Sequence, residues 1–160
     1  MDMTAGPAFP DGWFDRRQTY VALFPRTGDD WYATVVAAVQ EFPALRCVDR
    51  QALEENLTEI SDIGAFDLCK LISFGSLLQG PHASLRQPDT HRDECLARVL
   101  ESLGPSARFW TNHGHAEHGD AAHFLASSFH VNGLADATID VCLVGVSTES
   151  VLTLWRFEND

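Results

Sequence analysis

The chain has 160 residues, of which 45% are hydrophobic and 21% are charged. This length fits about one domain with a core of its own. Acidic residues outnumber basic ones by 23 to 11, which gives a net charge of −12 with the histidines neutral. Direct nucleic-acid binding is disfavoured, because neutralising phosphates requires clustered Lys and Arg. No apolar run reaches the length of about 18 residues that a membrane-spanning helix needs, so such a helix is excluded.

Residues 1–12 contain two prolines and two glycines and show no periodicity. We therefore expect a flexible lead-in over residues 1–12, followed by a single domain over residues 13–160. The start has neither the basic flank nor the apolar stretch of a secretory signal, which favours a cytoplasmic location. The cysteines form no C-x-x-C pair and are expected to be four buried free thiols in a reducing compartment. They are Cys47, Cys69, Cys95 and Cys142.

Residues 18–24 form a short β-branched and aromatic run that Pro25 closes, which predicts a strand. The next segment predicts a helix, because Thr27 or Asp29 can cap its start and Pro43 stops it. Apolar side chains recur there at steps of four, four and three residues, so they lie on one face. They are Trp31, Val35, Val39 and Phe42.

A second helix is predicted over residues 49–60, with Asp49 as its cap. Its apolar and acidic side chains fall on opposite faces, so that one face packs on the core and the other meets water. The apolar face holds Leu53, Leu57 and Ile60, and the acidic face holds Glu54, Glu55 and Glu59, with Asp62 just beyond.

Residues 65–79 are ambiguous between helix and strand. Their leucines favour a helix, which is the interpretation we prefer, although Gly75 weakens it by about 1 kcal/mol. Residues 80–88 contain Gly and Pro and predict a linker. Residues 89–103 predict a helix that Asp89 or Thr90 caps and that Gly-Pro ends. Its buried stripe consists of Leu96, Val99, Leu100 and Leu103.

After this helix the sequence has the composition of strands separated by polar turns, in residues 106–112, 121–131 and 136–158. Residues 138–146 are apolar on both faces, which predicts a central strand that is covered on both sides. Residues 147–150 predict a hairpin turn. The order of elements predicts an α+β fold, in which N-terminal helices pack on one face of a C-terminal antiparallel β-sheet.

Five of the seven histidines lie between residues 113 and 130. His113, His115, His118 and Asp120 could supply imidazoles and a carboxylate to zinc, and Glu117 could orient a ligand or act as a base. The same segment could instead be a solvated loop.

The histidine spacing resembles the H-x-H-x-D-H element of the metallo-β-lactamase superfamily, in which that element follows a strand and binds two metals. His113, His115 and His118 occupy its histidine positions, and Glu117 stands where the family has aspartate. The resemblance implies metal-dependent hydrolysis. It covers residues 113–120 only, and the chain after His118 is too short for the second half of that αββα fold.

No G-x-G-x-x-G, P-loop or G-x-S-x-G pattern occurs, so common nucleotide-binding and hydrolase motifs are missing. The leading hypothesis is a non-catalytic acidic protein without a cofactor. It would neutralise or occlude a basic or toxic protein partner, as an immunity protein or antitoxin does. The alternative is a zinc-dependent hydrolase or metal-binding protein that uses residues 113–120.

The residues predicted to contact the partner are acidic or aromatic, because aromatic anchors often dominate interface energies. They are Glu54, Glu55, Glu59, Asp62, Trp13 and Trp31, with Phe14 and Tyr32 as further aromatic candidates. Two simpler explanations stand beside this hypothesis. The aromatic side chains could fill the core, and the net charge could serve solubility alone.

Overall fold

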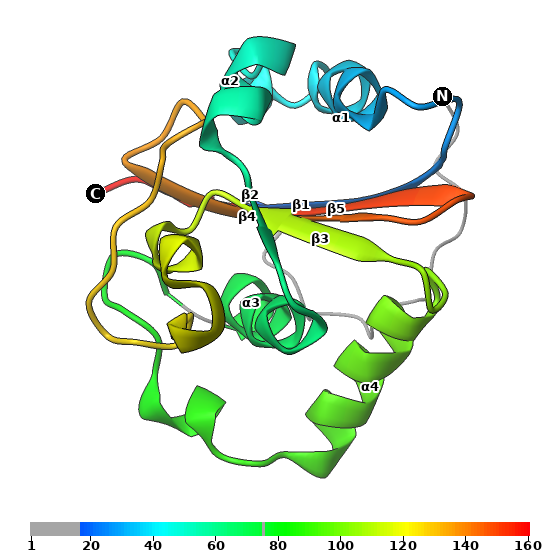
Figure 1. Cartoon of the computed structure of the whole chain (residues 1–160). Helices are drawn as coiled ribbons and strands as arrows, with labels where there is room; N and C mark the ends of the chain where they lie inside the picture. The colour runs from blue at the N-terminus through cyan, green and yellow to red at the C-terminus, as the bar shows by residue number, and fades with distance from the viewer. Residues whose placement is uncertain (1–16, 75) are drawn as a thin grey trace.

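The computed structural model of the chain describes residues 17–74 and 76–160. The predicted lead-in over residues 1–12 and the aromatic candidates Trp13 and Phe14 lie outside the described residues. A five-stranded antiparallel sheet crosses the middle of the molecule, with helices on either side of it (Figure 1). Within the described part of the chain, no helix is both long and apolar enough to span a membrane.

The strands follow the order β1-β5-β4-β3-β2 across the sheet. Their bounds are β1 Thr19–Pro25, β2 Thr58–Ile60, β3 Arg108–Thr111, β4 Ile139–Val146 and β5 Ser150–Glu158. The hairpin of β4 and β5 occupies the centre, joined by the predicted turn, in which Ser147 N donates to Ser150 O at 2.9 Å. Both outer strands come from the N-terminal half of the chain, so the sheet is not purely C-terminal as predicted.

Four α-helices and three 3₁₀ helices occur in the described residues. They are α1 Trp31–Val39, α2 Arg50–Asn56, α3 Asp62–Phe74, α4 Thr90–Glu101, η1 Pro43–Leu45, η2 Ala83–Arg86 and η3 Gly114–Ala121. Aspartates cap three of them, because their side chains accept a main-chain N–H of the first turn. Asp49 and Asp89 do so as predicted, whereas α1 is capped by Asp30 rather than by Thr27 or Asp29.

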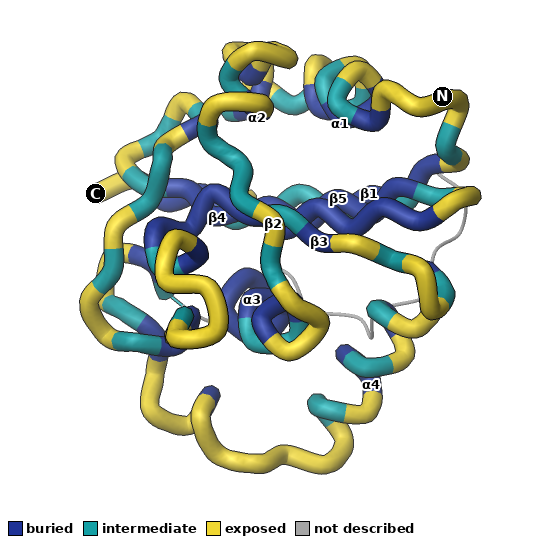
Figure 2. The backbone as a smooth tube through the Cα atoms, in the orientation of Figure 1, coloured by how far each residue is buried: buried dark blue, intermediate teal, exposed yellow. Residues whose placement is uncertain are grey.

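The predicted α+β class is confirmed, with helices packed on an antiparallel sheet. The helices cover both faces rather than the single face that we expected (Figure 1). We call α1 and α2 the upper layer, and α3 and α4 the lower layer. Figure 2 shows the buried residues concentrated in the sheet between these layers. A sheet that is apolar on both faces must be covered twice, since either face would otherwise expose hydrophobic surface to water.

The alternation predicted for the central strand is confirmed in β4. Val141 and Leu143 belong to the core against the lower layer, while Cys142, Val144 and Val146 belong to the core against the upper layer. All but Val146 of these five are fully buried. The period of two residues along the strand therefore divides one strand between two cores.

A buried polar network joins β3, β4 and β5 where β3 ends. The carboxylate of Asp140 accepts hydrogen bonds from Leu134 N at 3.0 Å, Trp155 Nε1 at 2.9 Å and Asn112 Nδ2 at 3.2 Å. Burial raises the pKa of Asp140, and these donors oppose that rise. Asn112 Oδ1 accepts from Cys142 N at 2.8 Å, so its side chain takes the place of a main-chain partner for β4.

The strand predicted over residues 121–131 is absent. This segment is irregular apart from one isolated bridge between His113 and Val131. The neighbouring side chains of Phe124 and Leu125 are both buried in the lower core. A strand would send consecutive side chains to opposite faces, so burying both on one side requires a loop.

The cysteines are free thiols, as predicted, but only three of the four are buried. Burial raises the pKa of the thiols of Cys69 and Cys142. Cys47 is exposed, and its Sγ donates to Leu134 O at 3.3 Å.

Candidate functional site

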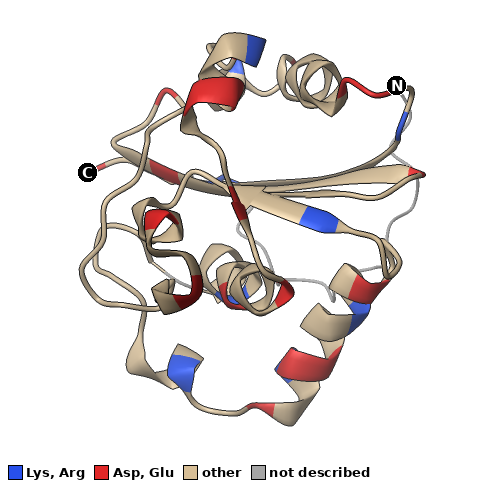
Figure 3. Cartoon of the chain, viewed as in Figure 1, with Lys and Arg blue, Asp and Glu red and all other residues tan. Residues whose placement is uncertain are grey.

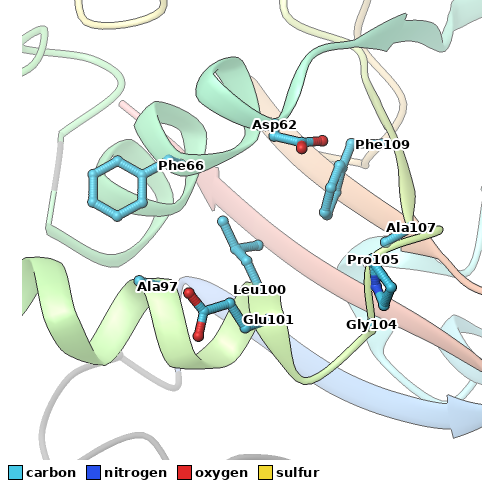
Figure 4. A pocket seen from close by; sticks show the side chains of 9 residues that line it. All are labelled: Asp62, Phe66, Ala97, Leu100, Glu101, Gly104, Pro105, Ala107 and Phe109. Atoms are coloured by element: carbon cyan, nitrogen blue, oxygen red, sulfur yellow. The ribbon is translucent and has the colours of Figure 1, made fainter.

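An apolar cleft with an acidic rim opens in the lower layer, between the first turn of α3, the end of α4 and the start of β3 (Figure 4). Its volume is about 490 Å³, within the range of sites that hold a small ligand or a few side chains of a partner. Its apolar walls are formed by Phe66, Ala97, Leu100, Ala107 and Phe109. The rim carries Asp62 and Glu101, and Gly104 and Pro105 close one end.

The floor of the cleft depends on a glycine in the central strand. Phe109 of β3 pairs with Gly145 of β4. A Cβ atom at position 145 would lie 2.9 Å from Phe109 Cε1 and 2.6 Å from Leu103 Cδ1, closer than side chains pack. The missing side chain therefore lets the Phe109 ring lie directly on the sheet and form the bottom of the cleft.

A second glycine shapes the mouth. Gly104 has φ +90°, which an L side chain rarely adopts, and its N–H donates to Glu101 O at 2.9 Å. This conformation ends α4 and directs the chain into β3. As a result, Glu101 stands at the helix end beside the opening, and Leu100 is left half-buried against the cleft.

The two carboxylates come from different helices and lie on opposite sides of the Leu100 side chain (Figure 4). Both residues are exposed. Among the described residues neither takes part in an ion pair, whereas Asp30 and Glu54 in the upper layer and Glu59 on the edge strand do. An ionised carboxylate can only accept hydrogen bonds, so the rim is suited to a cationic donor.

The single acidic helix face predicted over residues 49–60 is not formed. Helix α2 ends at Asn56, Leu57 is extended, and the chain continues as β2, whose residue Glu59 pairs with Trp110 of β3. Pairing along the edge of the sheet supplies the hydrogen bonds that another helical turn would have supplied. Figure 3 shows acidic residues spread over both helical layers.

The predicted acidic residues are therefore dispersed. Glu54 and Glu55 lie on α2 in the upper layer, Glu59 lies on the edge strand, and Asp62 begins α3 at the cleft. Glu55 accepts a hydrogen bond from Gln51 Nε2 at 2.9 Å. Of the four, only Asp62 lines the cleft.

Arginines engage two of the other three. Arg50 pairs with Glu54 and also donates to Asp30 Oδ2 at 3.0 Å, which lowers the pKa of Asp30. Arg108 donates two hydrogen bonds to Glu59, at 2.8 and 2.7 Å, and thereby lowers the pKa of that carboxyl. These carboxylates are already compensated within the chain.

Trp31 belongs to an aromatic row in the upper layer, which we define as Tyr32, Trp31 and Trp110. Trp31 stacks on Tyr32 with ring centres 3.9 Å apart and lies 4.7 Å from Trp110. Arg50 lies over Tyr32, and Arg108 lies over Trp110, each at 5.3 Å from the ring centre. Trp31 is only 7% exposed, so it packs in the core rather than at a surface.

His113 is buried in the lower core and does not face solvent. It is 1% exposed, its ring stacks on Phe129 at 4.7 Å, and it meets Phe124 edge-on at 5.0 Å. Its Nδ1 accepts a hydrogen bond from His115 N at 3.1 Å. Burial, together with nearby His115 and His130, lowers the pKa of His113 to about 3. The ring is therefore neutral at physiological pH.

The predicted zinc ligands do not converge on one point. His115 and His118 meet edge to face at 5.4 Å, while Glu117, His118 and Asp120 are exposed. In residues 17–74 and 76–160, no three His, Cys, Asp or Glu side chains are arranged to hold a metal ion. The solvated-loop interpretation fits the exposed part of this segment but not His113.

Sequence patterns did not identify Phe66, Leu100, Glu101 or Phe109 as site residues. The sequence pattern places Leu100 in the buried stripe of its helix, whereas in the structure it is half-buried, and no local pattern indicates this partial exposure at the helix end. The cleft forms from three segments that are far apart in the sequence, so only their packing reveals it.

No family model, no curated protein and no solved structure matches the chain. The cleft and its two carboxylates are accordingly the features on which a functional proposal rests.

Proposed function

We propose that the protein is a non-catalytic acidic binding protein that occludes a basic protein partner, in the manner of an immunity protein or antitoxin. The observation that carries this proposal is the cleft, because it combines open apolar walls with two carboxylates that have no cationic partner among the described residues. Protein interfaces have this composition, with an apolar centre and a polar rim. Binding of this kind requires neither a metal nor a cofactor.

The charge of the whole chain supports a cationic partner. A net charge of −12 attracts positively charged proteins and speeds their encounter. On the upper side of the sheet, Arg50 compensates Asp30 and Glu54, and Arg108 compensates Glu59. The long-range field then brings the partner near, and the cleft supplies the local contact.

Exposed apolar surface beside the cleft supports the same site. Ile63 follows Asp62 at the start of α3 and is 79% exposed, the most exposed large hydrophobic residue of the described chain. It precedes Phe66 by three residues, so both lie near the same side of the helix. In this proposal the contact with the partner extends from the cleft over Ile63.

The test compares two variants of equal charge. The cleft variant carries Asp62→Lys and Glu101→Lys, and the control variant carries Glu41→Lys and Asp136→Lys, which are exposed positions on the upper side. Wild type and control should capture the same basic protein from the native host, whereas the cleft variant should lose it. The purified partner should associate more slowly as salt is raised, and its activity should be abolished at one equivalent of wild-type chain.

Two results would contradict the proposal. One is equal capture of that protein by the cleft variant and the control. The other is an unchanged partner activity in the saturated complex, which would leave binding without occlusion.

A further inference from the structure

We infer that the cleft receives a segment of the partner in which one apolar side chain lies between two cationic side chains. This inference rests on the proposed function and specifies the chemistry of the partner at the cleft. The order of groups on the protein carries it, since Asp62 and Glu101 lie on either side of Leu100 (Figure 4). A complementary segment presents cation, apolar group and cation in the same order.

The apolar side chain of the partner segment is inferred from the walls of the cleft. Phe109 is 4% exposed and forms the floor, while Phe66 and Leu100 are half-buried and form the sides. A volume of about 490 Å³ exceeds that of one side chain. The space therefore accommodates an apolar side chain together with the methylene stems of two neighbouring Lys or Arg residues, which prefer apolar surface for their stems and water for their charged ends.

The two cationic side chains of the partner segment are inferred from the rim of the cleft. No Lys or Arg of the described chain lines the cleft, and Arg98, three residues before Glu101 on α4, donates to Cys95 Sγ at 3.2 Å. Arg108 is held by Glu59, and Lys70 lies 3.9 Å from Asp67 and over the Phe66 ring. The rim carboxylates are thus available to accept hydrogen bonds from ammonium or guanidinium groups, and hydrogen bonds between charged groups are stronger than neutral ones.

The experiment titrates the ¹⁵N-labelled full chain with three capped tripeptides and follows the amide resonances. The probe is Ac-Arg-Leu-Arg-NH₂. The first control replaces both arginines by citrulline, which keeps the size of the side chain but removes its charge and replaces two N–H donors by a carbonyl acceptor. The second control replaces leucine by glycine. We expect saturable shifts at Phe66, Leu100 and Phe109 with the probe, and dissociation constants at least fivefold higher with each control.

Two variants assign the contacts. The double variant Asp62→Asn, Glu101→Gln should lose the preference for arginine over citrulline while it still prefers leucine over glycine. The variant Glu41→Gln, which removes a carboxylate on the other side of the sheet, should bind all three peptides as wild type does. If the glycine peptide binds with the same dissociation constant as the probe, the cleft attracts charge alone and the inference is overturned. The absence of saturable shifts would also overturn it.

The outcomes separate this inference from the proposed function. If the tripeptide leaves the cleft resonances unchanged but a basic partner still depends on Asp62 and Glu101, the inference fails and the proposed function stands. If the tripeptide binds as expected but no protein is captured or neutralised through the cleft, the proposed function fails and the ligand chemistry of the cleft stands.

Discussion

The upper and lower layers differ in how they use charge. On the upper side of the sheet, Arg50 and Arg108 pair with nearby carboxylates and cover the two ends of the aromatic row. In the lower layer, Asp62 and Glu101 remain without ion-pair partners among the described residues, beside an apolar opening. Both layers contain acidic and aromatic residues. In the lower layer, unpaired carboxylates flank an open apolar cleft.

This difference shows that net charge does not identify a binding face. A carboxylate whose charge an arginine already compensates gains less from a second cation, whereas an unpaired carboxylate exchanges only water. Under the proposed function, the acidic residues that matter for the partner are those that the fold leaves uncompensated next to apolar surface.

The largest expected effect tests whether both layers are true cores. Leu143→Asp places an unpaired carboxylate against the lower layer, and Val144→Asp does the same against the upper layer, at positions that are both fully buried. Each change should cost several kcal/mol and abolish cooperative unfolding. Thermal unfolding followed by circular dichroism measures this, with Thr148→Asp in the exposed turn as the control. Normal melting of the Val144→Asp variant would show that the upper layer packs loosely.

The next effect concerns the lower core and pH. The pKa of His113 is about 3 in the folded chain and about 6.5 in the unfolded chain. Between these two pH values the unfolded chain therefore binds a proton that the folded chain does not bind. The free energy of unfolding should fall as the pH falls from about 6.5 to about 3, by about 2 kcal/mol at pH 5. Urea unfolding at several pH values should show a steeper dependence for wild type than for His113→Gln. Equal slopes would show that His113 is not held neutral.

A smaller effect tests the floor of the cleft. Gly145→Ala should displace Phe109 and Leu103, because the new Cβ would lie within 3 Å of both side chains. We expect a loss of about 1.5 kcal/mol in the free energy of unfolding, since Leu103 Cδ1 can move aside. Chemical denaturation measures the loss, and Gly133→Ala is a control at an exposed glycine where a Cβ meets only Asp140 Oδ1, at 3.7 Å. An unchanged free energy of unfolding would mean that Phe109 and Leu103 adjust to the new methyl group without strain.

The smallest effect contrasts the paired and unpaired acids directly. Glu54→Gln with Glu59→Gln removes charges that arginines compensate, and Asp62→Asn with Glu101→Gln removes the same number of charges from the cleft. Both double variants should change stability by less than about 1 kcal/mol, because the side chains are exposed. Association with the basic partner, measured by stopped flow, should slow severalfold more in the cleft variant. Equal slowing would reduce the role of the cleft to general attraction.

Predictions from sequence succeeded where short-range geometry decides the structure and failed at residues 57–60 and 121–131. Three members of the predicted stripe, Trp31, Val35 and Val39, are buried on α1, whereas Phe42 lies beyond the end of that helix. This stripe and the Asp89 cap of α4 depend on neighbours within one or two turns. At residues 57–60 a helical pattern continues in the sequence, yet the chain becomes β2, because β3 offers it a strand partner. A local pattern does not contain that partner, which lies about 50 positions further along the chain.

The sequence by itself determined the α+β class, the central hairpin of β4 and β5 and the two-sided burial of β4, since periods of two and 3.6 residues follow from backbone geometry alone. Only the tertiary structure decided that helices cover both faces, that His113 is buried, that Arg108 compensates Glu59, and that Asp62 and Glu101 flank a cleft. The physical reason is that the ion pairs and the solvent exposure of a side chain depend on which distant segments of the chain pack together. Side chains acquire partners, or remain open to a ligand, only when the layers pack.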